Sequence, residues 1–277
     1  MIGQKQLLQE IEKQINNKVF PRFCILVGTR GSGKKLLADS IAKSLNTIPI
    51  RLEDNSIASV RDMIEKSYKI VTPTTFIIPD ADSMSIAARN AMLKVVEEPP
   101  NNAYYIMTLE DANNTLETIR SRGTMFYMNN YSAKELEEYL KSNYKNEYNL
   151  FIANVCDTPG EIDKLYSMCN RGIEAFQEYV NLVIDSIATV SGANAFKIAN
   201  QVALKDTDEG YDLRLFWKAF MCECWQRYQS STEDIDSIEQ AIHITDISLQ
   251  QLRIKGVNRL FLMDKWILDI RRVWMED

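Results

Sequence analysis

The residues with the clearest chemical signature form a glycine-rich run near the N-terminus. The run matches the pattern G-x-x-x-x-G-K and directly follows an apolar stretch, residues 23–27. In such a loop the glycines let backbone N–H groups point at phosphate oxygens, and the lysine reaches the terminal phosphates. A glycine-rich turn without a ligand is the alternative. We predict a nucleotide-binding phosphate loop made by Gly28, Thr29, Arg30, Gly31, Ser32, Gly33, Lys34 and Lys35.

The last position of this run departs from the usual motif. Lys35 stands where a Ser or Thr hydroxyl normally coordinates Mg²⁺. An ammonium group cannot coordinate a metal ion and repels one at short range. ATP or ADP binding is therefore compatible with the loop, whereas productive placement of Mg²⁺ is not expected, and we predict no metal ligands.

Asp80 is the second candidate site residue. It follows the apolar run 75–78, where the metal-facing acid of a phosphate-loop protein belongs. In hydrolysing members of that class a Glu commonly follows, but here Ala81 does, and Asp82 is expected to point elsewhere. A turn-capping role is the alternative for Asp80. The pattern predicts a degenerate ATPase site with little or no hydrolysis of its own.

The elements that must position these residues follow from the apolar pattern. We expect strands at 23–27, 48–52, 75–78, 104–108 and 125–127, alternating with helices, one of which spans 85–98 and ends before Pro99. Such alternation predicts an α/β domain with a parallel sheet. Ser132 and Glu135 form a capping box for a later helix, and a loop is expected at 158–160.

Three domains are predicted from this pattern: an α/β nucleotide-binding domain at 1–130, a helical lid at 131–186 and a helical C-terminal domain at 187–277. The C-terminal stripe that includes Leu260, Trp266 and Trp274 is broad enough for a helix packed on more than one side. Local core packing and subunit packing are equally open readings of that stripe.

Composition limits the class of protein. The 277 residues carry a net charge of −6, which argues against nucleic-acid binding by a uniformly basic chain, yet residues 1–50 carry eight basic and three acidic side chains. The five cysteines lack metal-ligand spacing and suit a reducing cytoplasm. No signal peptide and no membrane span are expected.

One segment resembles a known family closely. Residues 90–100, Asn-Ala-Met-Leu-Lys-Val-Val-Glu-Glu-Pro-Pro, resemble the N-A-L-L-K-x-L-E-E-P-P segment of AAA+ clamp-loader subunits, and Ser121-Arg122-Gly123 resembles their S-R-C motif. The resemblance covers roughly residues 1–165. Asp80-Ala81 and Thr158-Pro159-Gly160 are most similar to the delta prime type of bacterial DNA polymerase III clamp-loader subunit, or to a viral counterpart.

The resemblance implies a function. Arg122 would act as an arginine finger, given in trans to a neighbouring subunit's ATP, although a surface salt bridge is the alternative for this residue. The chain would be a mostly non-hydrolysing subunit that scaffolds a hetero-oligomeric clamp-loader ring. Two other readings stay open: an ATP-hydrolysing motor subunit of such a loader, and a phosphate-loop kinase.

The implied partners are other loader subunits, the sliding clamp and primer-template DNA, the DNA being reached through the assembled complex. Arg89 is a candidate phosphate contact, with a solvated helix face as its alternative. The four tryptophans, at 217, 225, 266 and 274, are expected to pack the helical part, and His243 has no evident catalytic or metal partner.

Overall fold

The chain folds into two compact units. The computed structural model describes residues 3–144, 150–169, 172–189, 196–197, 212–230, 235–252, 254 and 256–275. One unit comprises Met1–Tyr139 with Thr158–Gly160, and the other comprises Leu140–Asp157 with Glu161–Asp277. This partition groups the expected lid and C-terminal domain together, and α9 (Ile173–Thr189) runs across their expected boundary at 186. The three-domain division stays a prediction.

The first unit is built on a five-stranded parallel sheet with the order β2-β3-β4-β1-β5. The strands are β1 Phe23–Val27, β2 Ile48–Arg51, β3 Thr74–Ile78, β4 Ala103–Leu109 and β5 Thr124–Tyr127. All five lie within one or two residues of the ranges expected from the apolar runs. Every residue of β1 and β3 is buried, as expected for inner strands covered on both faces.

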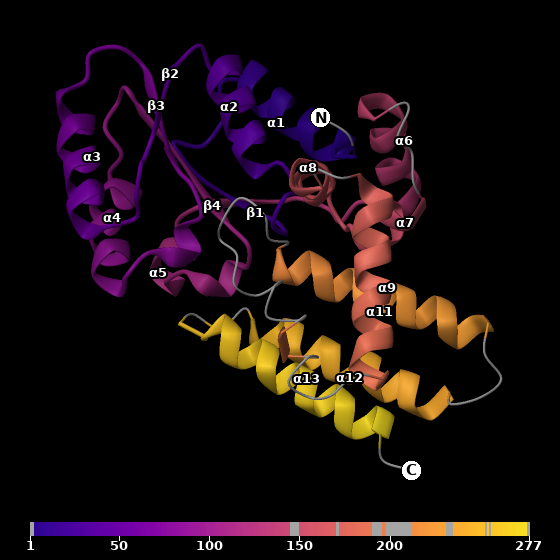
Figure 1. Cartoon of the computed structure of the whole chain (residues 1–277). Coiled ribbons are helices and arrows are strands. Elements are labelled where there is room, and N and C mark those ends of the chain that lie inside the picture. The colour runs from indigo at the N-terminus through magenta and orange to yellow at the C-terminus, as the bar shows by residue number, and fades with distance from the viewer. Residues whose placement is uncertain are drawn as a thin grey trace. The chain divides into compact units, whose positions relative to one another are not determined.

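Helices cover both faces of this sheet (Figure 1). Alternate side chains of β1 point to opposite faces, so Ile25 packs with Val60 and Met92, whereas Leu26 packs with Leu37 and Ile41. The first unit contains α1 Lys5–Asn16, α2 Lys34–Ser44, α3 Ile57–Lys69, α4 Ile86–Glu97 and α5 Glu117–Arg120, with the short 3₁₀ turns η1 Ala81–Ser83 and η2 Ala112–Asn114. The predicted α/β class of the first part is confirmed.

Side-chain caps fix several helix starts. The Ser85 hydroxyl accepts a hydrogen bond from the Ala88 N–H and begins α4. The predicted capping box begins α6, Ala133–Asn143: the Ser132 N–H donates to the Glu135 carboxylate at 2.8 Å, and the Glu135 N–H donates to the Ser132 hydroxyl at 3.3 Å. Both boundaries agree with the sequence patterns.

All the secondary structure among the described residues of the second unit is helical. Besides α9 it contains α7 Leu150–Val155, most of α8 Pro159–Met168, α11 Leu213–Ser230, α12 Ile235–Gln251 and α13 Arg259–Met275. Trp266 of α13 is fully buried, 4.8 Å from the Phe220 ring, and its indole N–H donates to the Thr245 hydroxyl. The broad stripe of α13 therefore packs on α12 as well as α9.

Two expectations for the helical part of the chain need correction. Pro159 occupies the first position of α8, where proline suits a helix start, so Pro159 and Gly160 lie in a helix instead of a loop. Trp217 and Trp266 are fully buried and Trp274 is half-buried, but Trp225 is 53% exposed and stacks on Tyr228. Trp225 is therefore not part of the buried core of the helical part.

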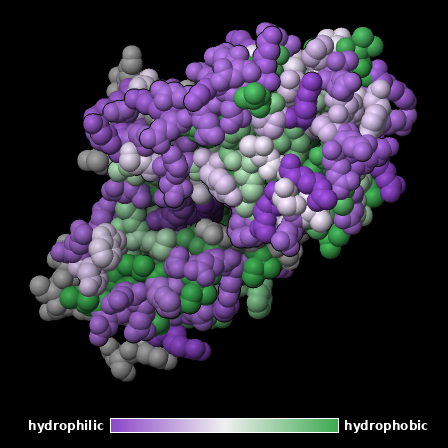
Figure 2. Space-filling view, turned by 180° about the vertical axis from the view of Figure 1, so that it is seen from behind, coloured by the Kyte–Doolittle hydropathy of each residue, from purple (hydrophilic) through white to green (hydrophobic). Residues whose placement is uncertain are grey.

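Hydrophilic residues dominate the face shown in Figure 2, with hydrophobic residues scattered among them. Within the described residues, no helix combines the length and the apolar character that crossing a bilayer would require.

Candidate functional site: the phosphate-loop edge of the sheet

The predicted phosphate loop connects the end of β1 to the start of α2. Gly31 and Gly33 have φ values of 80° and 91°, a left-handed conformation that glycine adopts without steric cost. The Gly28 N–H donates to the Leu109 carbonyl at 3.1 Å and ties the loop to the end of β4. The sequence therefore folds here into a loop whose backbone leads directly into the N-terminus of a helix, an arrangement suited to anions.

Lys34 points into this loop. Its Nζ donates to the carbonyl oxygens of Gly28 at 2.6 Å and of Thr29 at 2.9 Å, and the residue is only 6% exposed. Burial lowers the pKa of the Lys34 ammonium, while the nearby carboxylates of Glu110, Asp80 and Asp82 oppose that shift. The lysine predicted to contact phosphate is thus held inside the loop by two backbone carbonyls.

Lys35 and Asp80 form an ion pair at the same edge of the sheet. The Lys35 Nζ lies 2.6 Å from Asp80 Oδ2, and both side chains are about half exposed. The Asp80 backbone is held by Thr108, whose hydroxyl accepts from the Asp80 N–H, and by Asn55, whose Nδ2 donates to the Asp80 carbonyl. The structure brings Lys35 and Asp80 together, but they form an ion pair with each other, whereas Asp80 was expected to face a metal ion.

This pair does not fit Mg²⁺. The expected hydroxyl ligand is absent at residue 35, and the acid expected to face the metal is neutralised by an ammonium group. A cation placed beside Asp80 would meet the positive charge of Lys35 at short range. The residues at this edge therefore suit phosphate groups better than a metal–phosphate complex.

Asp82 serves a different purpose from Asp80. Its carboxylate accepts from the N–H groups of Glu110 and Asp111 and from the side-chain amide of Asn114. The side chain fastens the segment after β4, as expected for an acid that points away from Asp80.

The loop is also supported by residues that sequence reasoning did not assign to it. The Tyr131 hydroxyl donates to the Ser32 carbonyl at 2.8 Å, the Thr158 hydroxyl to the Arg30 carbonyl at 3.1 Å, and the Gly160 N–H to the Gly31 carbonyl at 3.1 Å. A Cβ at Gly160 would lie 2.7 Å from the Gly31 Cα. The resemblance singled out the motif at 158–160 without placing it against the phosphate loop, and nothing in the sequence singled out Tyr131.

Arg122 lies on the turn between α5 and β5, and its side chain is 42% exposed. Its Nε pairs with the Glu97 carboxylate at 3.1 Å, and its Nη1 donates to the Thr118 carbonyl at 3.0 Å. Because β1 and β5 are parallel, Arg122 precedes the sheet at its amino edge, whereas the phosphate loop follows β1 at the carboxyl edge. The structure does not bring Arg122 to this chain's own phosphate loop.

Gly123 has a packing reason to be glycine. A Cβ at this position would lie 2.6 Å from Cε1 of Phe23 and 2.9 Å from Cδ1 of Ile25, both buried in the core of the first unit. Glycine in place of the cysteine of the S-R-C motif thus leaves room for the Phe23 ring and keeps Arg122 in the motif.

The structure also shows the surroundings of Arg89, His243 and two of the cysteines. Arg89 is half-buried and its Nη2 donates to the Asp82 carbonyl at 3.0 Å, so it is not a solvated cation on a helix face. His243 is exposed on α12. Burial raises the pKa of Cys169 to about 11 and of Cys224 to about 12, so these thiols stay protonated at neutral pH.

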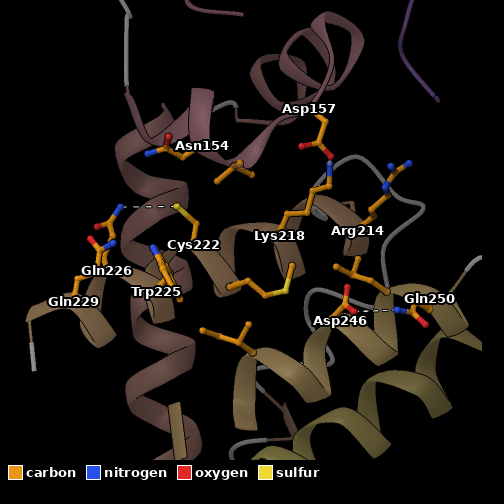
Figure 3. A pocket seen from close by; sticks show the side chains of 14 residues that line it. Asn154, Asp157, Arg214, Lys218, Cys222, Trp225, Gln226, Gln229, Asp246 and Gln250 are labelled. Carbon is orange, nitrogen blue, oxygen red and sulfur yellow. Dashed lines mark hydrogen bonds and ion pairs between the residues drawn. The ribbon is translucent and has the colours of Figure 1, made fainter. Parts of the chain in front are cut away.

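A pocket of about 730 Å³ lies in the second unit between residues of α7, α11 and α12 (Figure 3). Lys218 reaches Asp157 and the buried Glu161, and Arg214 lies 3.3 Å from Glu161, so acids of the same unit neutralise both cations. The sequence did not predict this pocket, and its paired charges do not make it an anion site.

The comparisons with known proteins agree with the resemblance seen in the sequence. The family model described as DNA polymerase III, delta subunit, matches residues 50–132. DNA polymerase III subunit gamma of Buchnera aphidicola is 27% identical over 181 residues, which cover 54% of this chain and 50% of that protein. Subunit delta' of Yersinia pestis is 34% identical over 77 residues, which cover 25% of this chain and 21% of that protein.

Subunit tau of Bacillus subtilis is 26% identical over 156 residues, which cover 46% of this chain and 28% of that protein. The chain thus spans half or less of the length of these three curated relatives.

Two solved structures share the fold. A DNA polymerase III gamma subunit-related protein of Thermotoga maritima has a TM-score of 0.53 at 17% identity, covering 96% of this chain and 99% of that one. The RuvB Holliday junction branch migration motor of the same organism has a TM-score of 0.50 at 17% identity, covering 87% and 82%. In its phosphate loop, its parallel sheet and its segment at 90–100, this chain is similar to AAA+ clamp-loader subunits.

Proposed function

We propose that the chain is a subunit of a sliding-clamp loader in DNA replication. In this role it scaffolds a hetero-oligomeric ring, hydrolyses little or no ATP itself, and supplies Arg122 in trans to the ATP of a neighbouring subunit. Its partners are the other loader subunits, the sliding clamp and, through the assembled complex, primer-template DNA. A cytoplasmic location suits this role and the free thiols.

The position of Arg122 is the observation that carries the proposal. The strands that separate it from the phosphate loop are four to five residues long, so the two edges lie roughly 13–17 Å apart at about 3.3 Å per residue. An exposed guanidinium at that edge is out of reach of this chain's own nucleotide. It is available to neutralise charge on a phosphoryl group bound by another subunit.

The phosphate-loop edge supports the other half of the proposal. The backbone cradle and Lys34 are in place, which favours binding of ATP or ADP, but Lys35 pairs with the acid that hydrolysis would need for a metal ion. The intact cradle also supports the alternative of a motor subunit. That alternative requires the Lys35–Asp80 pair to open and admit Mg²⁺.

The trans role is tested by Arg122→Ala in a loader reconstituted from this chain, its ATPase neighbours, the clamp and primer-template DNA. Arginine fingers contribute on the order of 10³-fold or more to hydrolysis at the site that they serve. We expect a loss of that size at the neighbour's site in single-turnover ATP hydrolysis. Arg61→Ala, an exposed arginine on α3, is the matched control. Unchanged hydrolysis with Arg122→Ala would refute the trans role.

A further inference from the structure

We propose that the Lys35 ammonium takes the place of Mg²⁺, so that the phosphate loop binds its nucleotide as the metal-free anion. This inference rests on the proposed binding of nucleotide at the loop. It goes beyond that proposal because it names the ligand as metal-free nucleotide and Lys35 as the residue that determines this preference.

The first support is where the ammonium lies. Lys35 follows Lys34 at the first turn of α2, the position whose side chain normally holds the metal ion against the phosphates. Its Nζ lies 2.6 Å from Asp80 Oδ2, the carboxylate that faces the metal in a phosphate-loop protein. One positive group therefore contacts the acid that a metal ion would contact.

The second support is that the structure holds Asp80 in place. Asp80 has a φ of 50°, in the left-handed region that few residues other than glycine adopt. Its N–H donates to the buried Thr108 hydroxyl, and its carbonyl accepts from the Asn55 amide, which also donates to the Pro79 carbonyl. Two neighbouring side chains thus fix, through three hydrogen bonds, the backbone from which the carboxylate meets Lys35.

The third support is the donor capacity of the ammonium group. A lysine carries three N–H donors, so Lys35 can bind Asp80 and phosphate oxygens at the same time. Lys34 adds a second cation on the loop side. Together they can donate hydrogen bonds to a diphosphate and offset part of its charge without a metal, whereas a bound Mg²⁺ would bring two more positive charges next to Lys35 and lose a hydroxyl ligand.

The test compares the affinity for ADP and ATP in excess Mg²⁺ and in EDTA, by calorimetry on the full chain. We expect the wild-type dissociation constant in EDTA to be equal to or lower than that in Mg²⁺. In Lys35→Thr, which restores a hydroxyl at the metal position, we expect binding to become about tenfold weaker in EDTA than in Mg²⁺. Lys43→Thr removes the same charge from an exposed site on α2 and should leave the wild-type pattern unchanged.

The outcomes separate this inference from the proposed function. Wild-type binding that is about tenfold or more weaker in EDTA would overturn the inference and leave nucleotide binding intact. Lys35→Thr that binds equally in both conditions would also overturn it, because the ammonium would then not determine metal dependence. Absence of binding in both conditions would overturn both this inference and the proposed nucleotide binding. The trans role of Arg122 has a separate test, which is ATP hydrolysis at the neighbouring subunit's site.

Discussion

The two edges of the parallel sheet differ in what they retain. At the carboxyl edge the phosphate loop keeps its glycines and Lys34, but a second lysine occupies the metal position and pairs with Asp80. At the amino edge Arg122 is exposed and paired with Glu97. In the proposed function, the missing hydroxyl limits hydrolysis at this chain's own loop, and the arginine serves a neighbouring subunit. The contrast between the edges is the one expected of a subunit that supports hydrolysis elsewhere.

The largest effect of a substitution on this chain's own ligand is expected at the phosphate loop. Lys34→Ala removes an ammonium that two carbonyls of the predicted phosphate loop hold in place. Because hydrogen bonds to charged groups contribute about 1.5–3 kcal/mol, we expect ADP affinity to fall roughly 10- to 100-fold. Calorimetric titration measures it, with Lys43→Ala as the control; equal affinity in both variants would show that nucleotide binds elsewhere.

Two glycines allow the packing at the two edges to be compared. Gly160→Ala drives a methyl group against the Gly31 backbone, so we expect a loss of about 1–3 kcal/mol in the free energy of unfolding. Gly123→Ala meets the Phe23 and Ile25 side chains, which can shift, so its cost should be smaller, about 1 kcal/mol. Urea unfolding of both variants measures this order, and a larger loss in Gly123→Ala would contradict it.

The sequence predicted the features that depend on neighbouring residues, but not the contacts between residues far apart in the chain. The five strands, the phosphate loop and the capping box at Ser132 follow from neighbouring residues, and the sequence indicated all of them. The ion pairs of Lys35 with Asp80 and of Arg122 with Glu97 join residues 45 and 25 positions apart. Only the crossover topology of the sheet brings such partners together.

The support of the phosphate loop shows the same limit. Thr158 reaches Arg30 across 128 positions, and Tyr131 reaches Ser32 across 99. The motif at 158–160 marked a distinctive segment, but its sequence alone placed it in a loop, because Pro and Gly are turn residues as often as residues of a helix start. Tertiary contact decided between the two.

A smaller effect is expected from the acid that holds Arg122. Glu97→Gln removes an ion pair between two side chains that are about half exposed, and such pairs contribute about 0.2–1 kcal/mol. We expect hydrolysis at the neighbour's site to fall roughly two- to fivefold because the guanidinium is less well oriented. Glu98→Gln changes the adjacent exposed acid and is the control. Equal hydrolysis rates in both variants would show that Glu97 does not orient Arg122.

The smallest effect concerns the pH dependence of stability. The pKa of Lys34 is lowered from 10.5 by burial, so folding disfavours its protonated form. This cost is fully present below the folded pKa and vanishes as pH rises through 10.5. The wild type should therefore gain stability relative to Lys34→Met between neutral pH and 10.5. Urea unfolding of both proteins at several pH values measures the free energy of unfolding of the wild type minus that of Lys34→Met. A value that stayed constant or fell as pH rises would contradict the prediction.

The most direct test of the central claim compares the two edges in one assembly. Reconstituted loaders carrying either Arg122→Ala or Lys34→Ala in this chain are assayed for single-turnover ATP hydrolysis. We predict that Arg122→Ala lowers hydrolysis at the neighbour's site on the order of 10³-fold, and that Lys34→Ala lowers total hydrolysis far less. The opposite pattern, with Lys34→Ala abolishing hydrolysis and Arg122→Ala leaving it intact, would contradict the account and make the chain a motor subunit.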